Sequence, residues 1–588
     1  MDSKHVTEST SGQEDIQKTW WKEAIIYQIY PRSFQDSDDD GSGDLNGITS
    51  RLDYIQSLGV DIIWLNPIFL SPNDDNGYDI SDYREIMREF GTMEDFDRLL
   101  KEIHKREMRL VLDLVVNHTS DEHPWFEEAR KSRHNPYYNY YHWWPAEKGE
   151  PPLRLSYFDE EGNAWMYNKP TDSYYLHYFS RKQPDLNWEN PEVRQEIFDM
   201  MRFWFDKGID GFRMDSISLI AKDPSFPLID SKKYPDIFSF YAKEPRLHLY
   251  LHEMNRQVLS KYDCMSVGEG SAVMVDDVAK FVDPAREELN MLYHFDAARI
   301  RNTTLPDNPE SGIDYSLIAL KKMFTEWDKA VDKGWPSIYL GNHDQPRMVS
   351  RFGSDKDEFR ALSAKMLITF LLTMRGTPYW FAGDEIGMRN IRFDHIENYN
   401  DIDTINRYKK AKAEGKDPQA VLDEQKETGR DNARTPFQWD RSPETGFTAG
   451  TPWLKVNPDY TWINVADEEK DPTSILNYFK KVVSFRKENP SLIYGSYHLL
   501  DAENPQCYTF LRKTGADTYL IMLNFSPKAA ISTPEIDMSN AHVLLDNYGD
   551  RSHMAPQKDI TLRPFEAIVF QLNHPVYESF IDSLDLLE

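Results

Sequence analysis

Short apolar runs recur along the chain, and a stretch with helical spacing follows each of them. Eight runs are rich in β-branched or aromatic residues: 24–30, 61–69, 109–116, 208–215, 264–269, 293–296, 337–344 and 377–385. Runs that are apolar at consecutive positions are typical of parallel strands buried on both faces of a sheet. Segments between the runs, such as 92–108 and 190–208, have apolar residues at helical spacing. Eight strand-plus-helix units over about 400 residues predict an α/β fold, a (β/α)₈ TIM barrel.

Two segments interrupt this alternation, and a different pattern ends the chain. The aromatic-rich segment between the third and fourth runs is too long for a loop, so we expect a small inserted domain after the third strand. The highly charged stretch 390–430 predicts a helical lid. Alternating runs at 507–513, 518–525, 541–547 and 567–572 predict a C-terminal antiparallel β-sandwich. The expected organisation is a disordered leader (1–18), a barrel (19–118 and 182–496), an inserted subdomain (119–181) and a sandwich (497–588).

Composition narrows the class of partner. The 588 residues include 68 Lys+Arg and 98 Asp+Glu, a formal charge of −30, which disfavours nucleic acid and anionic membranes. No run of about 18 apolar residues predicts a membrane span. The two cysteines, Cys264 and Cys507, have no metal-type spacing and exclude a disulfide framework. Since the first residues are polar and lack the apolar core of a signal peptide, we expect a cytoplasmic protein. We also expect a monomer.

Reactive side chains stand at the ends of the predicted strands. In barrels of this kind the active site lies at the C-terminal ends of the strands. One buried acid there is as readily part of a structural ion pair, but four acids on four strands of one barrel favour catalysis. These acids are Asp113, Asp215, Glu269 and Asp344, on the third, fourth, fifth and seventh strands.

Paired carboxylates are the groups that cleave glycosidic bonds, one attacking the anomeric carbon and the other protonating the leaving oxygen. Arg213 and Asp215 are two residues apart on a strand and face the same side, so the guanidinium would keep Asp215 ionised as a nucleophile. Glu269 follows an apolar run, and a dry setting would raise its pKa and suit it as the acid. The sugar hydroxyls would be held by His118, His343 and Asp344.

The segments 113–118, 211–216, 267–270 and 341–347 resemble the four sequence regions of the α-amylase superfamily, glycoside hydrolase family 13. From about Thr19 to the C-terminus the chain resembles the oligo-1,6-glucosidase and α-glucosidase branch, with sucrose isomerases as near relatives. The matching segments are WWKEAIIYQIYPRSF, NDDNGYDISDY, DLVVNHTSDEHPWF, KQPDLNW, GFRMD and RDNARTPFQWD. The resemblance implies Asp215 as nucleophile, Glu269 as acid/base and Asp344 as transition-state stabiliser. It also implies retention of configuration, with the two catalytic carboxyls about 5–5.5 Å apart.

The same resemblance implies a glucose-binding subsite. Together, Asp75 and Arg430 could clamp the non-reducing end in a closed pocket, which favours release of single terminal glucoses from disaccharides or short oligosaccharides. The alternative for Arg430 is a surface ion pair with Asp431 or Asp440. The implied substrate-binding residues are Asp75, Tyr78, His118, Phe179, Gln183, Arg213, His343 and Arg430.

An acidic loop follows the first predicted strand. Its acids occupy alternate positions as in the first half of a calcium loop, and Ser42 is placed to offer a backbone carbonyl. The twelfth position is Gly47 instead of a bidentate Glu, so the loop is not an EF-hand. A solvated acidic turn is the alternative, but related enzymes bind calcium with a similar loop, and we expect a structural Ca²⁺ and no organic cofactor. Its ligands would be Asp36, Asp38, Asp40, Ser42 and Asp44.

The chain departs from its branch beside each catalytic acid. Ser216 follows the nucleophile where Val accompanies α-1,6 specificity and Thr or Ala accompanies α-1,4 or sucrose-type specificity. Gly270 and Ser271 replace the Met-Pro of typical oligo-1,6-glucosidases. In the insertion, 151–165 departs from a Gly-rich stretch and leaves open which aromatic residue borders the glucose.

We therefore expect a retaining exo-acting α-glucosidase that acts on small α-glucosides such as isomaltose, maltose or sucrose. The alternative is a sucrose isomerase, which uses the same covalent step but returns the glucose to fructose. Segment 286–301 resembles that group in part, whereas HDQPRMVSRFG is more similar to the hydrolases. An inactive relative, such as a transporter-associated subunit, would lack the three acids and carry a membrane helix, so the residues disfavour it.

Overall fold

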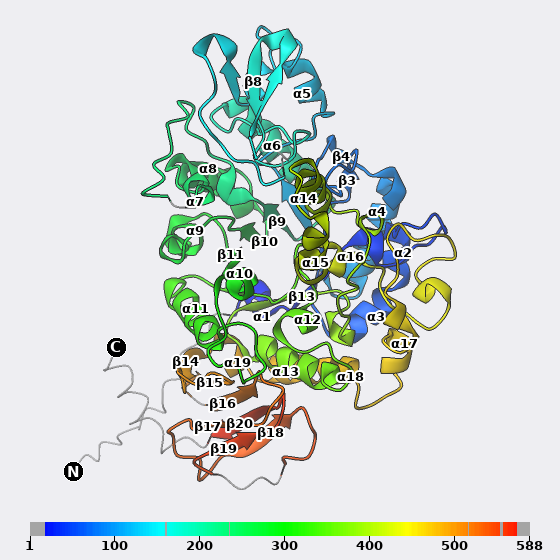
Figure 1. Ribbon diagram of the computed structural model, residues 1–588, viewed down its shortest axis with the longest axis vertical. Coiled ribbons are helices and arrows are strands. Elements are labelled where there is room, and N and C mark those ends of the chain that lie inside the picture. The colour runs from blue at the N-terminus through cyan, green and yellow to red at the C-terminus, as the bar shows by residue number, and fades with distance from the viewer. Residues whose placement is uncertain (1–17, 159–161, 235, 516, 553–556, 573–588) are drawn as a thin grey trace, which may run out of the picture.

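The computed structural model describes residues 18–158, 162–234, 236–515, 517–552 and 557–572 (Figure 1). Eight parallel strands form one sheet in the order β11-β10-β9-β5-β2-β1-β13-β12. They are β1 (Ile26–Ile29), β2 (Ile62–Leu65), β5 (Arg109–Val115), β9 (Gly211–Asp215), β10 (Met265–Glu269), β11 (Met291–Tyr293), β12 (Ser337–Ile338) and β13 (Thr377–Phe381). Each strand lies beside its predecessor in the chain, and β13 returns to β1, which confirms the predicted barrel.

The ring closes between β11 and β12 through side chains that bond to the opposite backbone. Ser337 Oγ donates to the carbonyl oxygen of Leu292 over 3.0 Å. The hydroxyl of Tyr339, just beyond β12, donates to the carbonyl oxygen of His294 over 2.5 Å. These two bonds hold together β11 and β12, which are the two shortest strands of the barrel.

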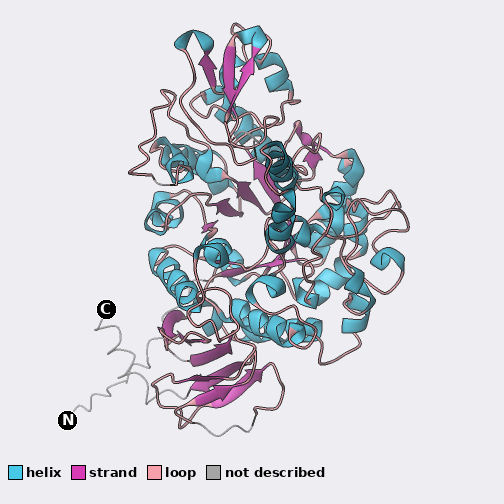
Figure 2. Ribbon diagram, in the orientation of Figure 1, coloured by secondary structure: helices cyan, strands magenta, loops and turns pink. Residues whose placement is uncertain are grey.

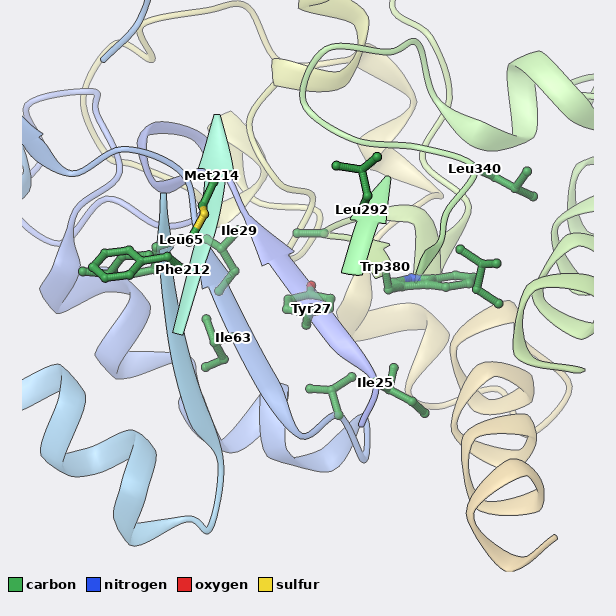
Figure 3. Packing of buried hydrophobic residues seen from close by; sticks show 14 of the residues in the cluster. Ile25, Tyr27, Ile29, Ile63, Leu65, Phe212, Met214, Leu292, Leu340 and Trp380 are labelled. Atoms are coloured by element: carbon green, nitrogen blue, oxygen red, sulfur yellow. The ribbon is translucent and has the colours of Figure 1, made fainter. Parts of the chain in front are cut away.

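Alternation along the strands separates two apolar layers. Side chains such as Ile26, Trp64 and Val267 fill the inside of the barrel. Their neighbours in sequence point outward and pack against the surrounding helices; Figure 3 shows part of this layer, including Tyr27 and Phe212. On β1, β2 and β5 the residues that continue the inward series toward the strand end are the polar Gln28, Asn66 and Asp113, so the sequence of these strands itself places polar groups at the barrel mouth.

The surrounding helices begin and end as their sequences dictate. Thr92 and Asp95 form a capping box at the start of α4, whose buried Phe96, Leu99 and Ile103 follow helical spacing. Gly208, with φ of 110°, ends α6 in a left-handed conformation that glycine adopts without strain. The helices around the barrel are α2 (Leu45–Ser50), α3 (Leu52–Ser57), α4 (Met93–Lys105), α6 (Pro191–Lys207), α8 (Arg246–Gln257), α9 (Ala279–Val282), α11 (Leu317–Ala330), α13 (Arg360–Thr373) and α18 (Ile475–Glu488).

Two excursions leave the barrel. After β5 come α5 (Pro124–Ala129) and an antiparallel sheet in the order β6-β8-β7, made of β6 (Trp143–Pro145), β7 (Trp165–Asn168) and β8 (Ser173–Leu176). After β13 the charged stretch forms the helical hairpin α14 (Ile402–Ala413) and α15 (Pro418–Thr428), followed by α16 (Asp431–Arg434). A hydrogen bond joins the two excursions, because Asn406 Nδ2 donates to the carbonyl oxygen of Phe158 over 2.7 Å.

The remaining elements are short connections. They are α1 (Trp20–Glu23), β3 (Phe69–Leu70), β4 (Asp82–Ile86), α7 (Phe238–Tyr241), α10 (Asp296–Thr303), α12 (Met348–Phe352), α17 (Val465–Glu468) and α19 (Ser491–Tyr494). The strands β3 and β4 pair antiparallel and precede the third barrel strand. The described residues contain no helix that is both long and apolar enough to cross a membrane.

Antiparallel sheets end the chain, at the end of the molecule opposite the inserted sheet (Figure 2). Their strands are β14 (Ser496–Leu500), β15 (Cys507–Lys513), β16 (Thr518–Asn524), β17 (Ala530–Ser532), β18 (His542–Asp546), β19 (Ile560–Leu562) and β20 (Ala567–Leu572). A buried guanidinium ties them to the barrel, because Arg512 Nη1 donates to the carbonyl oxygen of Thr373 over 2.6 Å. Both cysteines are free, and the buried Cys507 of β15 packs in the apolar cluster of these sheets.

One strand was displaced in the sequence prediction. The sixth run was expected at 293–296, but β11 ends at Tyr293 and Phe295 caps helix α10. The buried pair Met291 and Leu292 supplies the strand, and the polar His294 belongs to the turn. The expected disordered leader falls on residues 1–17, outside the described residues, and on Lys18.

Candidate active site

Inward-facing positions at the strand ends bring five polar side chains together. Asp113 is two residues beyond the core residue Val111, and Arg213 and Asp215 are the corresponding positions on β9. Glu269 and Tyr293 complete the group at the ends of β10 and β11. The group therefore comes from four adjacent strands of the barrel.

Arg213 is the centre of this group. Its Nη1 donates to Asp113 Oδ1 and to Asp215 Oδ1, both over 2.7 Å, and its Nη2 donates to Glu269 Oε2 over 2.8 Å. Its Nε donates to the Tyr293 hydroxyl over 2.7 Å. The guanidinium is only 1% exposed, whereas the side chains of Asp215 and Glu269 are 11% and 8% exposed. A ligand above the strands can therefore reach the two carboxylates while the arginine supports them from beneath.

Of these acids, Glu269 has the pKa that is shifted most strongly from its ordinary value. Burial raises its pKa well above the ordinary value, and the negative charges of Asp215 and Asp344 raise it further against the opposing charge of Arg213. The backbone N–H of Ser216 also donates to Glu269 Oε2, over 2.8 Å. A carboxyl that retains its proton near neutral pH is suited to protonating a leaving group.

Asp113 holds other residues of the site in place. It accepts hydrogen bonds from Trp64 Nε1 over 3.1 Å, from Asn66 Nδ2 over 3.3 Å and from the Tyr78 hydroxyl over 3.1 Å. Burial raises its pKa to about 6, against the lowering charge of Arg213. Since Asp113 is completely buried and fully bonded, it fixes the positions of Arg213 and Tyr78 instead of meeting a substrate.

His343 and Asp344 lie beyond β12. Gln28 Nε2 donates to His343 Nδ1 over 2.8 Å, so the proton of the neutral ring is on Nε2, 3.1 Å from Asp344 Oδ2. Burial lowers the pKa of His343 to about 3 and keeps the ring neutral. Burial would raise the pKa of Asp344, but the guanidiniums of Arg430 and Arg434 hold it below the ordinary value. Asp344 is thus an ionised carboxylate, 22% exposed at the mouth of the barrel.

Asp75 and Arg430, the two residues predicted to clamp the non-reducing end, lie in contact. Arg430 Nη2 lies 3.2 Å from Asp75 Oδ1, and its Nη1 lies 3.2 Å from Asp344 Oδ1. Its Nε donates to Asp401 Oδ1 over 2.6 Å, which anchors it to the start of α14. These partners replace the surface ion pair with Asp431 or Asp440 that was the alternative. Burial raises the pKa of Asp75 to about 7, although Arg430 lowers it.

The remaining predicted residues line one side of the clamp. Gln183 Nε2 donates to Asp75 Oδ2 over 3.2 Å and lies 3.2 Å from His118 Nε2. His118 also lies 3.0 Å, through Nε2, from the carbonyl oxygen of Tyr78, and burial lowers its pKa. The ring of Phe179 lies 5.1 Å from that of His118. All the residues predicted to bind glucose or to catalyse are therefore joined by contacts around Arg213 and Arg430.

Several residues of the site were not predicted from the sequence. Arg434 donates to Asp344 Oδ1 over 3.0 Å, and Asp401 anchors Arg430. In the insertion, the ring of Tyr157 stacks on Phe179 at 5.1 Å, and the ring of Phe158 lies 5.0 Å from the Arg430 guanidinium. Arg434 lies in the segment RDNARTPFQWD, whose resemblance could have drawn attention to it. No spacing rule could have paired Phe158 with a residue of the lid.

The acidic loop after β1 gathers three of its five predicted ligands. Carboxylate oxygens of Asp36, Asp38 and Asp40 all lie within 4.8 Å of one another, and Asp44 is not part of this group. Asp44 instead accepts from the backbone N–H of Ser37 and of Gly47, each over 2.7 Å, and caps α2. The Ser42 hydroxyl is buried and meets no hydrogen-bond partner among the described residues.

Comparison with known proteins identifies the family. The family model for the catalytic domain of alpha amylase matches residues 28–495. The chain is 51% identical to the oligo-1,6-glucosidase of Parageobacillus thermoglucosidasius over 571 residues, covering 95% of this chain and 100% of the relative. It is 48% identical to that of Bacillus cereus over 567 residues, again covering 95% and 100%.

Solved structures of an isomaltulose synthase and a trehalulose synthase share the fold. The isomaltulose synthase of Protaminobacter rubrum is 42% identical, with a TM-score of 0.89 over 95% of this chain and 100% of that one. A trehalulose synthase is 41% identical, with a TM-score of 0.89 over 94% and 100%. From the family match and from relatives of this similarity over nearly the whole length, the chain belongs to the α-amylase family and is a glycoside hydrolase.

Proposed function

We propose that this enzyme is a retaining, exo-acting α-glucosidase that removes terminal glucose from small α-glucosides. The observation that carries the proposal is the single guanidinium of Arg213, which binds Asp215 and Glu269 from adjacent strands. It holds two carboxylates with different tasks in one place. The similarity to oligo-1,6-glucosidases over 95% of the chain supports the substrate class.

The reaction proceeds in two displacements. Asp215 attacks the anomeric carbon, while Glu269 gives its proton to the glycosidic oxygen and the aglycone leaves. Glu269, now a carboxylate, takes a proton from a water molecule, which attacks the same carbon and releases Asp215. Two inversions return the α-configuration. Asp344 remains ionised beside the reacting ring and binds hydroxyls most strongly when positive charge develops there.

The clamp supports the exo-acting mode. Arg430 contacts both Asp75 and Asp344, so these three charged side chains close the site on one side of the catalytic acids. A terminal glucose can offer its hydroxyls to these side chains, because no further sugar is attached at its non-reducing end. An internal glucose would place that next sugar against the Arg430–Asp401 anchor.

A panel of substrates tests the proposal. Purified enzyme is incubated with maltose, isomaltose, trehalulose and p-nitrophenyl α-glucoside, and free glucose and its first-formed anomer are measured. The expected result is release of α-glucose. In Asp215→Asn the rate of this release should fall by roughly 10⁴-fold. Release of β-glucose, or an Asp215→Asn variant as active as the parent, would overturn the mechanism.

A sucrose isomerase is the second candidate, favoured by the TM-score of 0.89 to trehalulose and isomaltulose synthases. The higher identity to the oligo-1,6-glucosidase, 51% against 42%, favours hydrolysis. Incubation with sucrose separates the two, since hydrolysis produces free glucose and fructose and isomerisation produces an isomeric disaccharide. Cytoplasmic location and a monomeric state stay predictions from the sequence.

We also propose a structural Ca²⁺ at the acidic loop. The three clustered carboxylates of Asp36, Asp38 and Asp40 suit a hard cation that prefers oxygen ligands. The Ser42 carbonyl would complete the set from this loop, while Asp44, engaged as the cap of α2, would orient it. The ion would join the loop to the chain near Gly41, whose carbonyl oxygen accepts from the Trp453 N–H over 2.9 Å. Its contribution would be to stability, because the catalytic acids belong to other strands.

A further inference from the structure

The two carboxyl oxygens of Glu269 have different surroundings. Oε2 accepts from Arg213 Nη2 and from the Ser216 N–H, each over 2.8 Å. Oε1 accepts from the hydroxyl of Ser271 over 3.4 Å. A guanidinium and a backbone N–H donate and cannot accept, so a proton on Oε2 would face two donors. The transferable proton is therefore on Oε1, the oxygen beside Ser271.

A rigid turn holds Ser271 in this place. The Gly270 N–H donates to the Tyr293 carbonyl oxygen over 2.8 Å, and Ser218 Oγ donates to the Ser271 carbonyl oxygen over 2.5 Å. Ala272 follows with a left-handed φ of 61°. A Cβ at position 270 would meet Leu292 Cδ2 and the Tyr293 carbonyl oxygen at 2.9 Å, so the turn approaches β11 closely.

We propose that Ser271 is a positioning residue for the acid/base, and that its hydroxyl donates a hydrogen bond to Oε1 of Glu269 whenever that oxygen has lost its proton. The inference rests on the proposed α-glucosidase function and names a residue that serves its two proton transfers. In the first step the proton leaves Oε1 for the glycosidic oxygen, and the Ser271 hydroxyl stabilises the carboxylate that forms. In the second step the same bond keeps Oε1 aimed at the attacking water. No net proton passes through the serine.

The bond has the length expected of a resting enzyme. At 3.4 Å it is longer than an ordinary O–H···O bond, and catalytic hydrogen bonds are often long before substrate binds and shorten in the complex. The Ser271 hydroxyl is free to rotate and can follow Oε1 as the charge on it grows. A bond that strengthens with charge contributes to the transition state more than to the ground state.

The dependence on leaving group gives this role a specific signature. Isomaltose leaves as a sugar alkoxide that requires the proton of Glu269, whereas p-nitrophenolate leaves without one. A defect in the acid therefore slows the cleavage of isomaltose and spares that of p-nitrophenyl α-glucoside. A merely structural role for Ser271 would slow both reactions equally.

The experiment compares the parent enzyme, Ser271→Ala and the matched control Ser271→Thr, which keeps a hydroxyl. Thermal unfolding first verifies that the variants fold. For Ser271→Ala we expect kcat/KM for isomaltose to fall roughly threefold to tenfold and that for p-nitrophenyl α-glucoside to change less than about twofold. The alkaline limb of the isomaltose profile should move up by about half a pH unit or more, because the carboxylate loses a donor. Ser271→Thr should restore both values.

The outcomes separate this inference from the proposed function. An equal loss on both substrates, an unmoved alkaline limb or a Ser271→Thr variant as slow as Ser271→Ala would overturn the role of the hydroxyl and leave the glucosidase function standing. A parent enzyme that cleaves neither substrate would overturn both.

Discussion

Replacing Arg430 with methionine tests the clamp. The side chain keeps a similar apolar stem but loses the charge that faces Asp75, Asp344 and Asp401 at 3.2, 3.2 and 2.5 Å. Arg434 stays 3.0 Å from Asp344 and 3.9 Å from Asp401, so those two acids keep a partner. Among the described residues, the Asp75 carboxylate then accepts a hydrogen bond only from the amide of Gln183 at 3.2 Å, with Arg434 farther away, and becomes the least compensated charge.

The size of the effect follows from that one buried carboxylate. Without Arg430 the carboxyl can stay neutral by keeping a proton, so the cost is bounded by the free energy of protonating it, which is about 1.4 kcal/mol at pH 8, one pH unit above the pKa of about 7. For 588 residues that unfold together, the entropy of unfolding is about 1.2 kcal/mol/K, so the midpoint should fall by about 1 °C at pH 8. The pKa of Asp75 is already about 7, so at pH 6 the carboxyl is mostly protonated and depends little on Arg430. The deficit should therefore be largest at pH 8 and shrink toward pH 6.

The sign of this dependence follows from proton binding. Between about pH 4 and pH 7 the folded protein holds a proton on Asp75 that the unfolded chain has released, so this group's contribution to stability falls as the pH rises. Without Arg430 the pKa rises further, and the window extends upward. Scanning calorimetry at pH 6, 7 and 8 measures it, with KM for isomaltose expected to rise in parallel.

A surface arginine on the preceding helical hairpin is the matched control. Arg407, 38% exposed and paired with Glu424, should change stability by less than about 1 kcal/mol as Arg407→Met at every pH. A deficit for Arg430→Met that is the same at pH 6 and pH 8, or no larger than that of Arg407→Met, would refute the clamp as described.

The other predictions concern the acid, the stabiliser and the metal. Glu269→Gln should lose the alkaline limb of the pH profile, since the raised pKa of Glu269 sets it, and should slow isomaltose far more than p-nitrophenyl α-glucoside; an intact limb would assign the acid elsewhere. Asp344→Asn should lower kcat/KM by at least about 10²-fold with little change in midpoint, measured by steady-state kinetics and calorimetry; a change in KM alone would reduce Asp344 to a binding group. Chelation of calcium should lower the melting temperature of the parent but not of Asp38→Asn, and an equal fall in both would remove Asp38 from the metal site.

The barrel could be predicted because its signals are local. Each strand is a run of buried residues, and the acids follow the runs directly, as with Asp215 at the end of β9 and Glu269 at the end of β10. Alternation then decides which side chains face inward. The same rule placed the sixth strand too far along the chain, since β11 ends at Tyr293. A short polar turn and a strand end look alike in a sequence.

The contacts that complete the site could not be predicted, because they join distant segments. Asp401 and Arg430 are 29 residues apart, and Arg434 and Asp344 are 90 apart. Nothing in the spacing of either residue indicates the other. Asp44 shows another limit: the alternating acids predicted it as a metal ligand, which stays a prediction, but they did not indicate that its carboxylate also caps α2.

Trapping the glucosyl-enzyme tests the two-carboxylate mechanism most directly. In Glu269→Gln, α-glucosyl fluoride can still react with Asp215 because fluoride needs no acid, but the missing base should slow the release of the sugar. Mass spectrometry of the digested protein should then find one glucosyl group esterified to the peptide that contains Asp215. A glucosyl group on any other residue, or turnover of the fluoride with inversion and no adduct, would contradict Asp215 as the nucleophile.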